Sequence, residues 1–127
     1  CLNFKKRLFF EGYRVFDHIG KRSVDKLTNS LLKKIISYGV GEIICQSVTN
    51  DGCWDGFPAD HISKGNIFKD ITVPLIFLGG IGNIKEINKL LSLDECSAVS
   101  ISSLAVFQRK NQGVVISFPR NEEIVNG

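Results

Sequence analysis

Short apolar runs alternate with amphipathic stretches along most of the chain. The runs occupy residues 43–45, 73–78 and 98–101, and residues 2–4 are a candidate for an earlier, truncated member of the series. The three runs are nearly continuous in apolar side chains, which is typical of parallel strands that have helices on one face and other side chains filling the opposite face. Because helical spacing fills the stretches between several runs, the pattern predicts repeated βα units and the α/β class of fold.

The clearest helix is predicted over residues 24–38. Apolar side chains recur there at spacings of three and four, at Val24, Leu27, Leu31, Ile35 and Tyr38. Ser23 is expected to be the N-cap, and Gly39 is expected to supply the left-handed residue that ends the helix.

A second helix is expected to begin at Asn83, because Glu86 follows three residues later in a spacing similar to a capping box. Residues 58–69 predict a weaker helix, since Gly65 lies in its middle. The second helix is predicted to bury Ile84, Ile87, Leu90 and Leu91.

Two other segments are predicted to be extended. Residues 13–16 are expected to form a hairpin arm with the segment around Phe9, across a turn at Gly12. Residues 113–118 alternate weakly, which indicates an extended tail rather than a helix. Since no linker or low-complexity stretch occurs, residues 1–127 are expected to form a single unit.

Composition excludes several classes of protein. The fractions of hydrophobic residues, 43%, and charged residues, 23%, are typical of a globular domain with its own core. The net charge of +3 is too small to indicate a nucleic-acid partner. No run of about 18 apolar residues and no signal-peptide pattern occurs, so we expect a cytoplasmic protein that does not enter a membrane.

The cysteines at positions 1, 45, 53 and 96 form no CxxC pair and have no nearby histidine at metal-ligand spacing. We therefore expect reduced thiols, no metal site and no cofactor. His18 and His61 are isolated, which favours surface or loop positions over roles as ligand or base. A mature lipoprotein also begins with cysteine, but residues 2–4 are typical of a strand and not of the polar tether that usually follows.

Polar or glycine-rich loops follow three of the predicted strands. In parallel α/β folds, ligands bind beyond the carboxyl ends of the strands, and glycines let backbone N–H groups approach a phosphate. The three loops therefore predict one binding site, made of Asp51, Gly52, Gly79, Gly80, Ser102 and Ser103.

Each of these signals alone has a plainer structural explanation. Asp-Gly and Gly-Gly pairs are common in turns, and two serines can cap a following helix. Trp54 is expected either to cover the site or to pack as a partly buried aromatic residue. The occurrence of all three loops at successive strand ends is what favours a functional site.

Three ordered segments resemble the cyclase subunit of imidazole glycerol phosphate synthase, a phosphate-binding (β/α)8 barrel. Residues 41–44 followed by 47–52 are similar to that family's sixth strand and loop, GAGEILL followed by SIDRDG. Residues 73–82 resemble the seventh strand and its loop, and residues 98–107 resemble the eighth strand and its phosphate-binding turn. The resemblance implies the carboxyl-terminal half of a TIM barrel, strands 5 to 8, as a (β/α)4 unit.

The resemblance also implies a function. The family's cyclase, a lyase of histidine biosynthesis, takes ammonia from a glutaminase partner, a glutamine amidotransferase, and forms imidazole glycerol phosphate from a phosphorylated intermediate. The six loop residues would hold one phosphate through backbone amides and the Ser103 hydroxyl. Asp51 is expected to orient its loop rather than touch the phosphate, because two anions side by side repel each other.

Three departures from the family pattern leave the role of the chain open. Asn3 stands at the family's catalytic Asp position on the fifth strand, and an amide cannot ionise or shuttle a proton. Cys53 and Trp54 stand where the family has small polar residues. Residues 113–119 resemble instead a paralogous branch that passes ammonia to an activated sugar in surface-polysaccharide biosynthesis.

Three interpretations follow from these observations. The chain is a cyclase-type enzyme, a sugar-amidation paralogue, or a noncatalytic half-barrel that binds phosphate and forms a homodimer through its open sheet edges. Since a (β/α)8 barrel has about 250 residues, we expect these 127 residues, which include no methionine, to be half of a longer protein.

Overall fold

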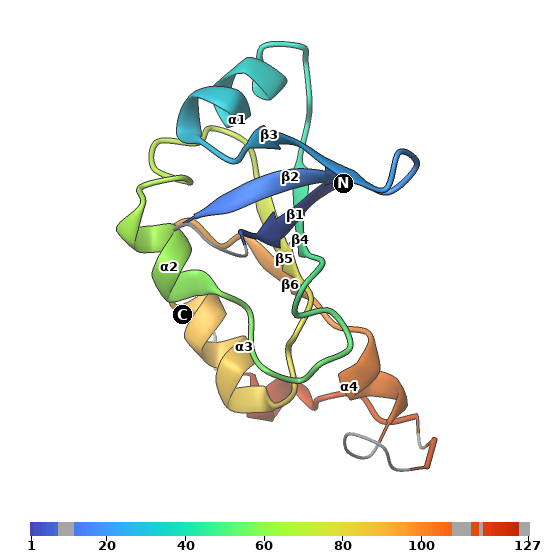
Figure 1. Cartoon of the computed structure of the whole chain (residues 1–127). Coiled ribbons are helices and arrows are strands. Elements are labelled where there is room, and N and C mark those ends of the chain that lie inside the picture. Colours follow the sequence, from blue (N-terminus) through green and yellow to red (C-terminus); the bar gives the residue numbers. More distant parts are fainter. Residues whose placement is uncertain (8–11, 108–112, 115, 125–127) are drawn as a thin grey trace.

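The computed structural model describes residues 1–7, 12–107, 113–114 and 116–124. Its centre is a six-stranded sheet with the strand order β3-β2-β1-β4-β5-β6 (Figure 1). The strands are β1 (Leu2–Lys6), β2 (Tyr13–Asp17), β3 (Arg22–Lys26), β4 (Ile43–Ser47), β5 (Leu75–Leu78) and β6 (Ala98–Ser100). The pairs β1–β4, β4–β5 and β5–β6 are parallel, whereas β2 and β3 extend the sheet as an antiparallel meander beside β1.

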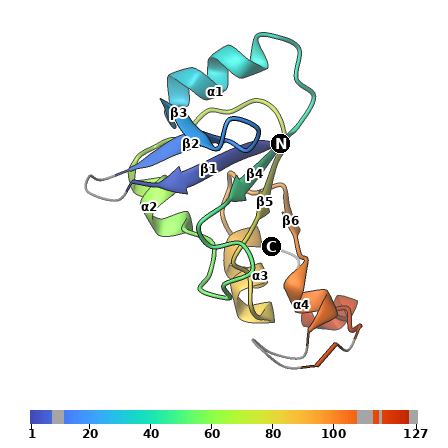
Figure 2. The same ribbon diagram turned by 45° about the vertical axis from the view of Figure 1, so that its right-hand side comes forward.

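Helices connect the parallel strands and follow the last of them. They are α1 (Asn29–Ile36), α2 (Ala59–Lys64), α3 (Ile84–Leu91) and α4 (Ser103–Val106), and a short 3-10 turn covers Asn121–Glu123. Both views place α2 and α3 on one side of the sheet and α4 beyond the carboxyl end of β6 (Figures 1 and 2). The predicted βα order is confirmed, and the architecture is that of half of a (β/α)8 barrel.

The two faces of the parallel strands differ in burial. On the face toward the helices, Phe4, Cys45, Ser47 and Phe77 are at most 1% exposed. On the other face, residues such as Gln46 are only half-buried, so burial alternates along β4 and β5. The half-buried face corresponds to the interior of a complete barrel, which explains why the runs are apolar on both faces.

Aromatic side chains fill the core between the sheet and the helical layer. Phe57 stacks on Phe77 with ring centroids 4.6 Å apart, and Phe4 meets Phe57 edge to face at 5.9 Å. Phe68 packs on the same Phe77 ring at 5.3 Å. These contacts fix the segment that leads from the loop after β4 into α2.

The predicted helix over residues 24–38 is wrong at its start. Residues 22–26 form β3, which pairs with β2, and Val24 is 46% exposed. The helix begins at Asn29 because Thr28 is the N-cap, accepting a hydrogen bond from the Leu31 N–H at 3.2 Å. Cross-strand hydrogen bonds therefore outweigh an apolar spacing that fits a helix by coincidence.

Gly39 is left-handed as predicted, but the helix ends at Ile36 and not at Tyr38, and its buried face differs from the predicted one. Ser37 is the C-cap, and Gly39 has a φ of +86°. Tyr38 is 74% exposed, whereas Leu32 is fully buried. The apolar stripe thus passes through Leu32 instead of ending at Tyr38.

Three other predictions compare with the structure as follows. β2 pairs with β1, with Tyr13 opposite Lys6, and the predicted partner Phe9 lies outside the described residues. Helix α2 is shorter than predicted, because it ends at Lys64, directly before Gly65. The tail is extended in its described part, where Val114 forms a β-bridge with Phe107.

The predicted second helix is confirmed as α3. It begins after Asn83 and buries Ile87 and Leu90, with Ile84 and Leu91 packed against the core. Within the described part of the chain, we find no helix long and apolar enough to cross a membrane.

Candidate functional site

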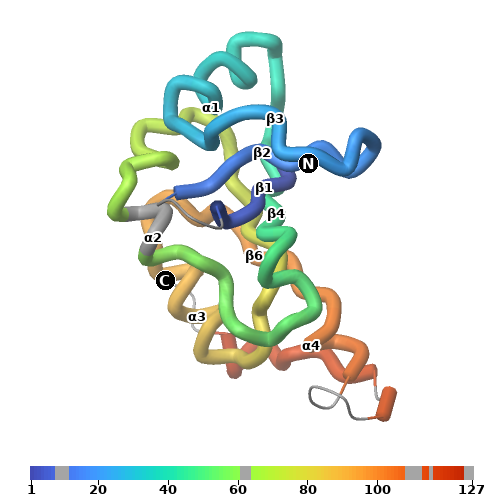
Figure 3. Tube along the Cα trace, in the orientation of Figure 1, coloured from blue at the N-terminus to red at the C-terminus, as the bar shows by residue number. Residues whose placement is uncertain are grey.

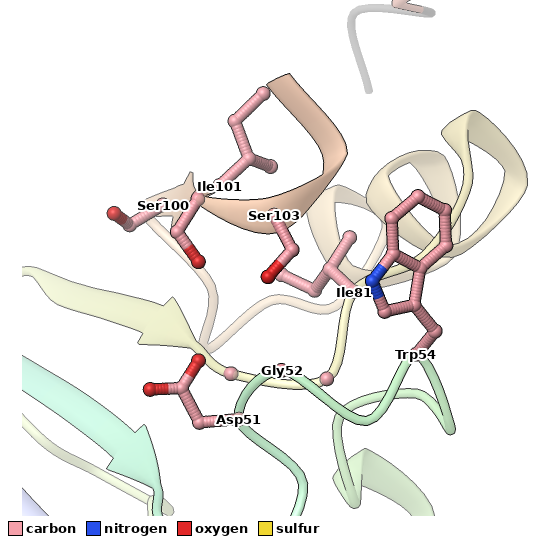
Figure 4. A pocket seen from close by; sticks show the side chains of 10 residues that line it. Asp51, Gly52, Trp54, Ile81, Ser100, Ile101 and Ser103 are labelled. Atoms are coloured by element: carbon pink, nitrogen blue, oxygen red, sulfur yellow. The ribbon is translucent and has the colours of Figure 1, made fainter. Parts of the chain in front are cut away.

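The loops that follow β4, β5 and β6 meet at one end of the sheet and line a single pocket (Figure 4). The trace in Figure 3 shows the loop after β4 and helix α4 at this same end of the molecule. The pocket is lined by Asp51, Gly52, Trp54, Gly79, Gly80, Ile81, Ser100, Ile101, Ser102 and Ser103. The structure therefore brings together all six residues that the loop pattern singles out.

The loop after β4 is held rigidly by its own polar side chains. The Ser47 hydroxyl, which is fully buried, donates to Asn50 Oδ1 at 2.8 Å, and Asn50 Nδ2 donates to the Gly56 carbonyl at 2.9 Å. The Asp51 N–H closes the turn on the Ser47 carbonyl at 3.0 Å. Asn50 thus supports the pocket from behind, a role that its place in the sequence does not reveal.

The glycines after β5 permit a close approach between two loops. Gly79 and Gly80 have φ values of +104° and +89°. A Cβ atom on Gly80 would lie 2.5 Å from the Gly56 carbonyl oxygen, and one on Gly79 would lie 2.8 Å from the Ser47 carbonyl oxygen. The Gly56 N–H donates to the Gly80 carbonyl at 2.9 Å, which joins the two loops directly.

Several backbone N–H groups around the pocket find no acceptor among the described residues. Among the hydrogen bonds of the described residues, none is donated by the backbone of Gly52, Gly80 or Ile81. Gly80 and Ile81 are nevertheless buried. Buried N–H groups are almost always paired with protein, water or ligand, so these donors are suited to bind an anion or ordered water.

Two backbone N–H groups near the start of helix α3 have side-chain acceptors within the protein. Glu86 Oε2 accepts from the Gly82 N–H at 2.8 Å, and Asn83 Oδ1 accepts from the Glu86 N–H at 3.0 Å. This arrangement differs from a regular capping box, in which Glu86 would reach the Asn83 N–H. The donors of this segment that line the pocket, Gly80 and Ile81, lie before Gly82 in the glycine turn itself.

Serine and aspartate side chains form opposite walls of the pocket. Figure 4 shows the Ser103 hydroxyl directed into the space between Asp51 and Ile81. Ser102 makes no side-chain capping bond to α4. The Asp51 carboxylate is held by Gln46, whose Nε2 donates to Oδ2 at 2.8 Å.

Asn3 lies apart from the pocket. It is not among the lining residues, and in the sheet it stands opposite Gln46 on the half-buried face. Its Oδ1 accepts a hydrogen bond from the Cys1 thiol at 3.5 Å. Gln46 therefore neighbours Asn3 in the sheet and donates a hydrogen bond to the Asp51 carboxylate.

The surroundings of two cysteines raise their pKa values. Burial raises the pKa of the Cys45 thiol to about 12 and that of Cys96 to about 11, against ordinary values of 9.0. Both thiols therefore stay protonated near neutral pH. In the described ranges, no group of three or more His, Cys, Asp and Glu residues is placed to hold a metal ion.

Sequence reasoning missed several residues of the site. Ser100, at the end of β6, and Ile101 line the pocket directly before the two predicted serines, so the strand-end rule that found the serines also applies to them. Gln46 and Glu86 act through hydrogen bonds to other loop residues. Both bonds are local, but no motif singles out Gln46, and the capping-box spacing of Glu86 indicates a bond to the Asn83 N–H and not to that of Gly82.

Comparison with known proteins shows the family of the chain. The profile of the family described as histidine biosynthesis protein matches residues 2–111. A protein of Leptospira interrogans, provisionally named imidazole glycerol phosphate synthase subunit HisF, is 33% identical over 97% of this chain and 48% of its own length. A protein of Vibrio vulnificus strain YJ016 with a similar provisional name is 37% identical over 97% of this chain and 46% of its own.

A third relative carries the name without qualification. The imidazole glycerol phosphate synthase subunit HisF of Chloroherpeton thalassium is 30% identical over 76% of this chain and 38% of its own length. The chain thus spans about half the length of these first two curated relatives. It belongs to the histidine biosynthesis protein family and is similar to half of a HisF-type cyclase subunit.

Proposed function

We propose that the pocket at the carboxyl ends of β4, β5 and β6 binds the phosphate group of a phosphorylated substrate. The observation that carries this proposal is that the backbone N–H groups of Gly52, Gly80 and Ile81, three residues that line the pocket, find no acceptor among the described residues. Amides directed to one concave space stabilise an anion without any cationic side chain. Lysine and arginine are absent from the lining residues, which is consistent with a site of this kind.

The Asp51 carboxylate limits where a phosphate sits in this pocket. Two anions in contact repel each other, so the phosphate belongs on the side of Gly80 and Ser103, away from Asp51. The hydrogen bond from Gln46 keeps the carboxylate fixed on its own wall. The rest of the substrate then extends from the phosphate toward the half-buried face of the sheet, where Asn3 and Gln46 lie.

Phosphate binding is tested by isothermal titration calorimetry of the 127-residue chain with inorganic phosphate. Ser103→Ala removes one hydrogen bond to a charged ligand, so we expect the affinity to fall by about tenfold or more. Ser37→Ala is the matched control, because the Ser37 hydroxyl donates to the Lys34 carbonyl at the end of α1. Absence of binding to the unaltered chain, or equal effects of the two variants, would contradict the proposal.

The activity we propose is that of an imidazole glycerol phosphate synthase cyclase-type protein in histidine biosynthesis. Ammonia would come from a glutaminase partner, since the HisF relatives are named as subunits of a synthase. Asn3 stands at the position of the family's catalytic aspartate and carries no acid or base function. Asn3→Asp in the completed barrel is therefore expected to raise the rate of cyclisation, and a lower rate would argue against this activity.

A sugar-amidation paralogue is the second candidate function. It is favoured by the amide at Asn3 and by the tail, which lies extended along α4 with the Ser117 N–H donating to the Ala105 carbonyl at 2.9 Å. Rescue of a histidine auxotroph by the gene distinguishes the two. Rescue supports the histidine-pathway role, whereas failure of an expressed, phosphate-binding protein to rescue supports the paralogue.

The half-buried face of the sheet requires a covering partner in either case. A complementary amino-terminal half would complete the barrel, and a second copy of this chain would cover the same face as a homodimer. Sedimentation velocity of the 127-residue chain separates these partners. A dimer supports self-association, and a stable monomer contradicts it.

A further inference from the structure

Trp54 has a backbone conformation that is unusual for a large side chain. Its φ is +63°, in the left-handed region that favours glycine. It is also the single tryptophan of the chain. Bulky residues persist in this region only where surrounding contacts hold them, and they concentrate at functional sites.

Contacts with the glycine turn hold Trp54 in place. A Cβ atom on Gly82 would lie 3.1 Å from both Cβ and Cε3 of Trp54, so the indole packs against a glycine that leaves room for it. On either side, the Cys53 N–H donates to the Asn50 carbonyl and the Gly56 N–H donates to the Gly80 carbonyl, each at 2.9 Å. The ring is therefore positioned by the loops on both sides of it.

The indole of Trp54 lies next to the proposed phosphate site. Trp54 is half-buried and lines the same pocket as Gly80 and Ser103. Figure 4 shows the indole beside Ile81, with its nitrogen on the side that faces Ile81 and Ser103. The apolar, planar indole of Trp54 thus borders the polar part of the pocket.

We infer that Trp54 is a specificity-determining residue that contacts the carbon skeleton next to the bound phosphate. This inference rests on the proposed phosphate site. Backbone amides recognise the phosphate, and the indole face buries C–H groups of the ester, which inorganic phosphate does not have. The pocket therefore prefers a sugar-phosphate type of ester to the free anion.

Calorimetric titration of the 127-residue chain with inorganic phosphate and with ribose 5-phosphate tests the inference. Trp54→Gly removes the ring and relieves the left-handed backbone, so the loop is expected to keep its geometry. The variant should bind ribose 5-phosphate about five- to tenfold more weakly and inorganic phosphate within about twofold of the original chain. Trp54→Phe is the control, because it keeps an aromatic face and should lose less.

The outcomes distinguish a failure of the phosphate site from a failure of the contact between Trp54 and the ester. If the unaltered chain binds neither compound, the phosphate site itself is contradicted. If it binds both, and Trp54→Gly weakens both equally or neither, the contact between Trp54 and the ester is overturned. A selective loss of ribose 5-phosphate that Trp54→Phe restores supports the inference.

Tryptophan fluorescence supplies a second measurement, because all of the indole emission comes from Trp54. Ribose 5-phosphate should shift or quench this emission with the same midpoint as the calorimetric titration, and inorganic phosphate should change it less. Unchanged emission at saturating ribose 5-phosphate would overturn the contact.

Discussion

Gly80 is the residue on which the shape of the pocket depends most. Its positive φ and the proximity of Gly56 both exclude a side chain, and its N–H is one of the donors left for a ligand. Gly39 has a similar φ of +86°, but a Cβ atom there would meet nothing within 4 Å. The two glycines therefore separate the effect of backbone conformation from the effect of steric contact.

Gly80→Ala is expected to destabilise the chain by about 2 to 4 kcal/mol, since it adds a steric overlap to the conformational strain. Gly39→Ala, the control, should cost only about 1 kcal/mol from the strain alone. Urea unfolding of both variants measures the difference. Equal free energies of unfolding would show that the Gly80–Gly56 approach is not as close as described.

Cys45 links stability to alkaline pH. Burial raises its pKa from 9.0 to about 12, so the thiol ionises in the unfolded chain before it ionises in the folded one. The stabilisation is complete below pH 9 and is lost as the pH rises toward 12. Between pH 8 and pH 10 the free energy of unfolding should fall by about 1.4 kcal/mol more in the original chain than in Cys45→Ala. Parallel pH profiles of the two proteins would contradict this assignment.

At the scale of elements, the residues at the start of α3 both stabilise this helix and hold the glycine turn that lines the pocket. Asn83 caps the helix through the Glu86 N–H, and Glu86 in turn holds the Gly82 N–H at the end of the glycine turn. Thr28 caps α1 in the same way, through the Leu31 N–H. Helix α1 contributes no residue to the pocket lining.

Asn83→Ala and Thr28→Ala should each lower the free energy of unfolding by about 1 kcal/mol, because each removes one N-cap. Only Asn83→Ala should also weaken phosphate binding, since it loosens the turn that contains Gly80 and Ile81. Unfolding curves and phosphate titrations of both variants provide the measurement. A similar change in affinity for both variants would mean that α3 does not position the site.

The elements also show which parts of the fold the sequence determines locally. β4, β5, β6 and α3 follow directly from continuous apolar runs and from the Asn83 cap, because these signals lie within each segment. β3 does not, since Val24 fits a helical spacing and only its pairing with β2 makes it a strand. The site is similar: strand-end glycines and serines are visible in the sequence, whereas the hydrogen bonds from Gln46 and Asn50 depend on how the loop after β4 folds back on itself.

At the scale of the molecule, the chain is four successive βα units with an antiparallel extension beside β1. Its helical side is a closed core, while its other face is half-buried and corresponds to a barrel interior. The pocket lies at the carboxyl ends of the strands, where (β/α)8 barrels bind their ligands. The fold and the pocket therefore lead to the same account, a half-barrel that contributes a phosphate site.

The most direct test of this account is a titration of the isotopically labelled chain with inorganic phosphate, followed by the backbone amide signals in NMR spectra. The amides of Gly52, Gly80, Ile81 and Ser103 should show the largest shifts and should saturate together with one dissociation constant. Amides at the opposite ends of the strands, such as Ser97 and Val73, should stay unchanged. Absence of saturable shifts at the three loops, or larger shifts elsewhere, would contradict the phosphate site.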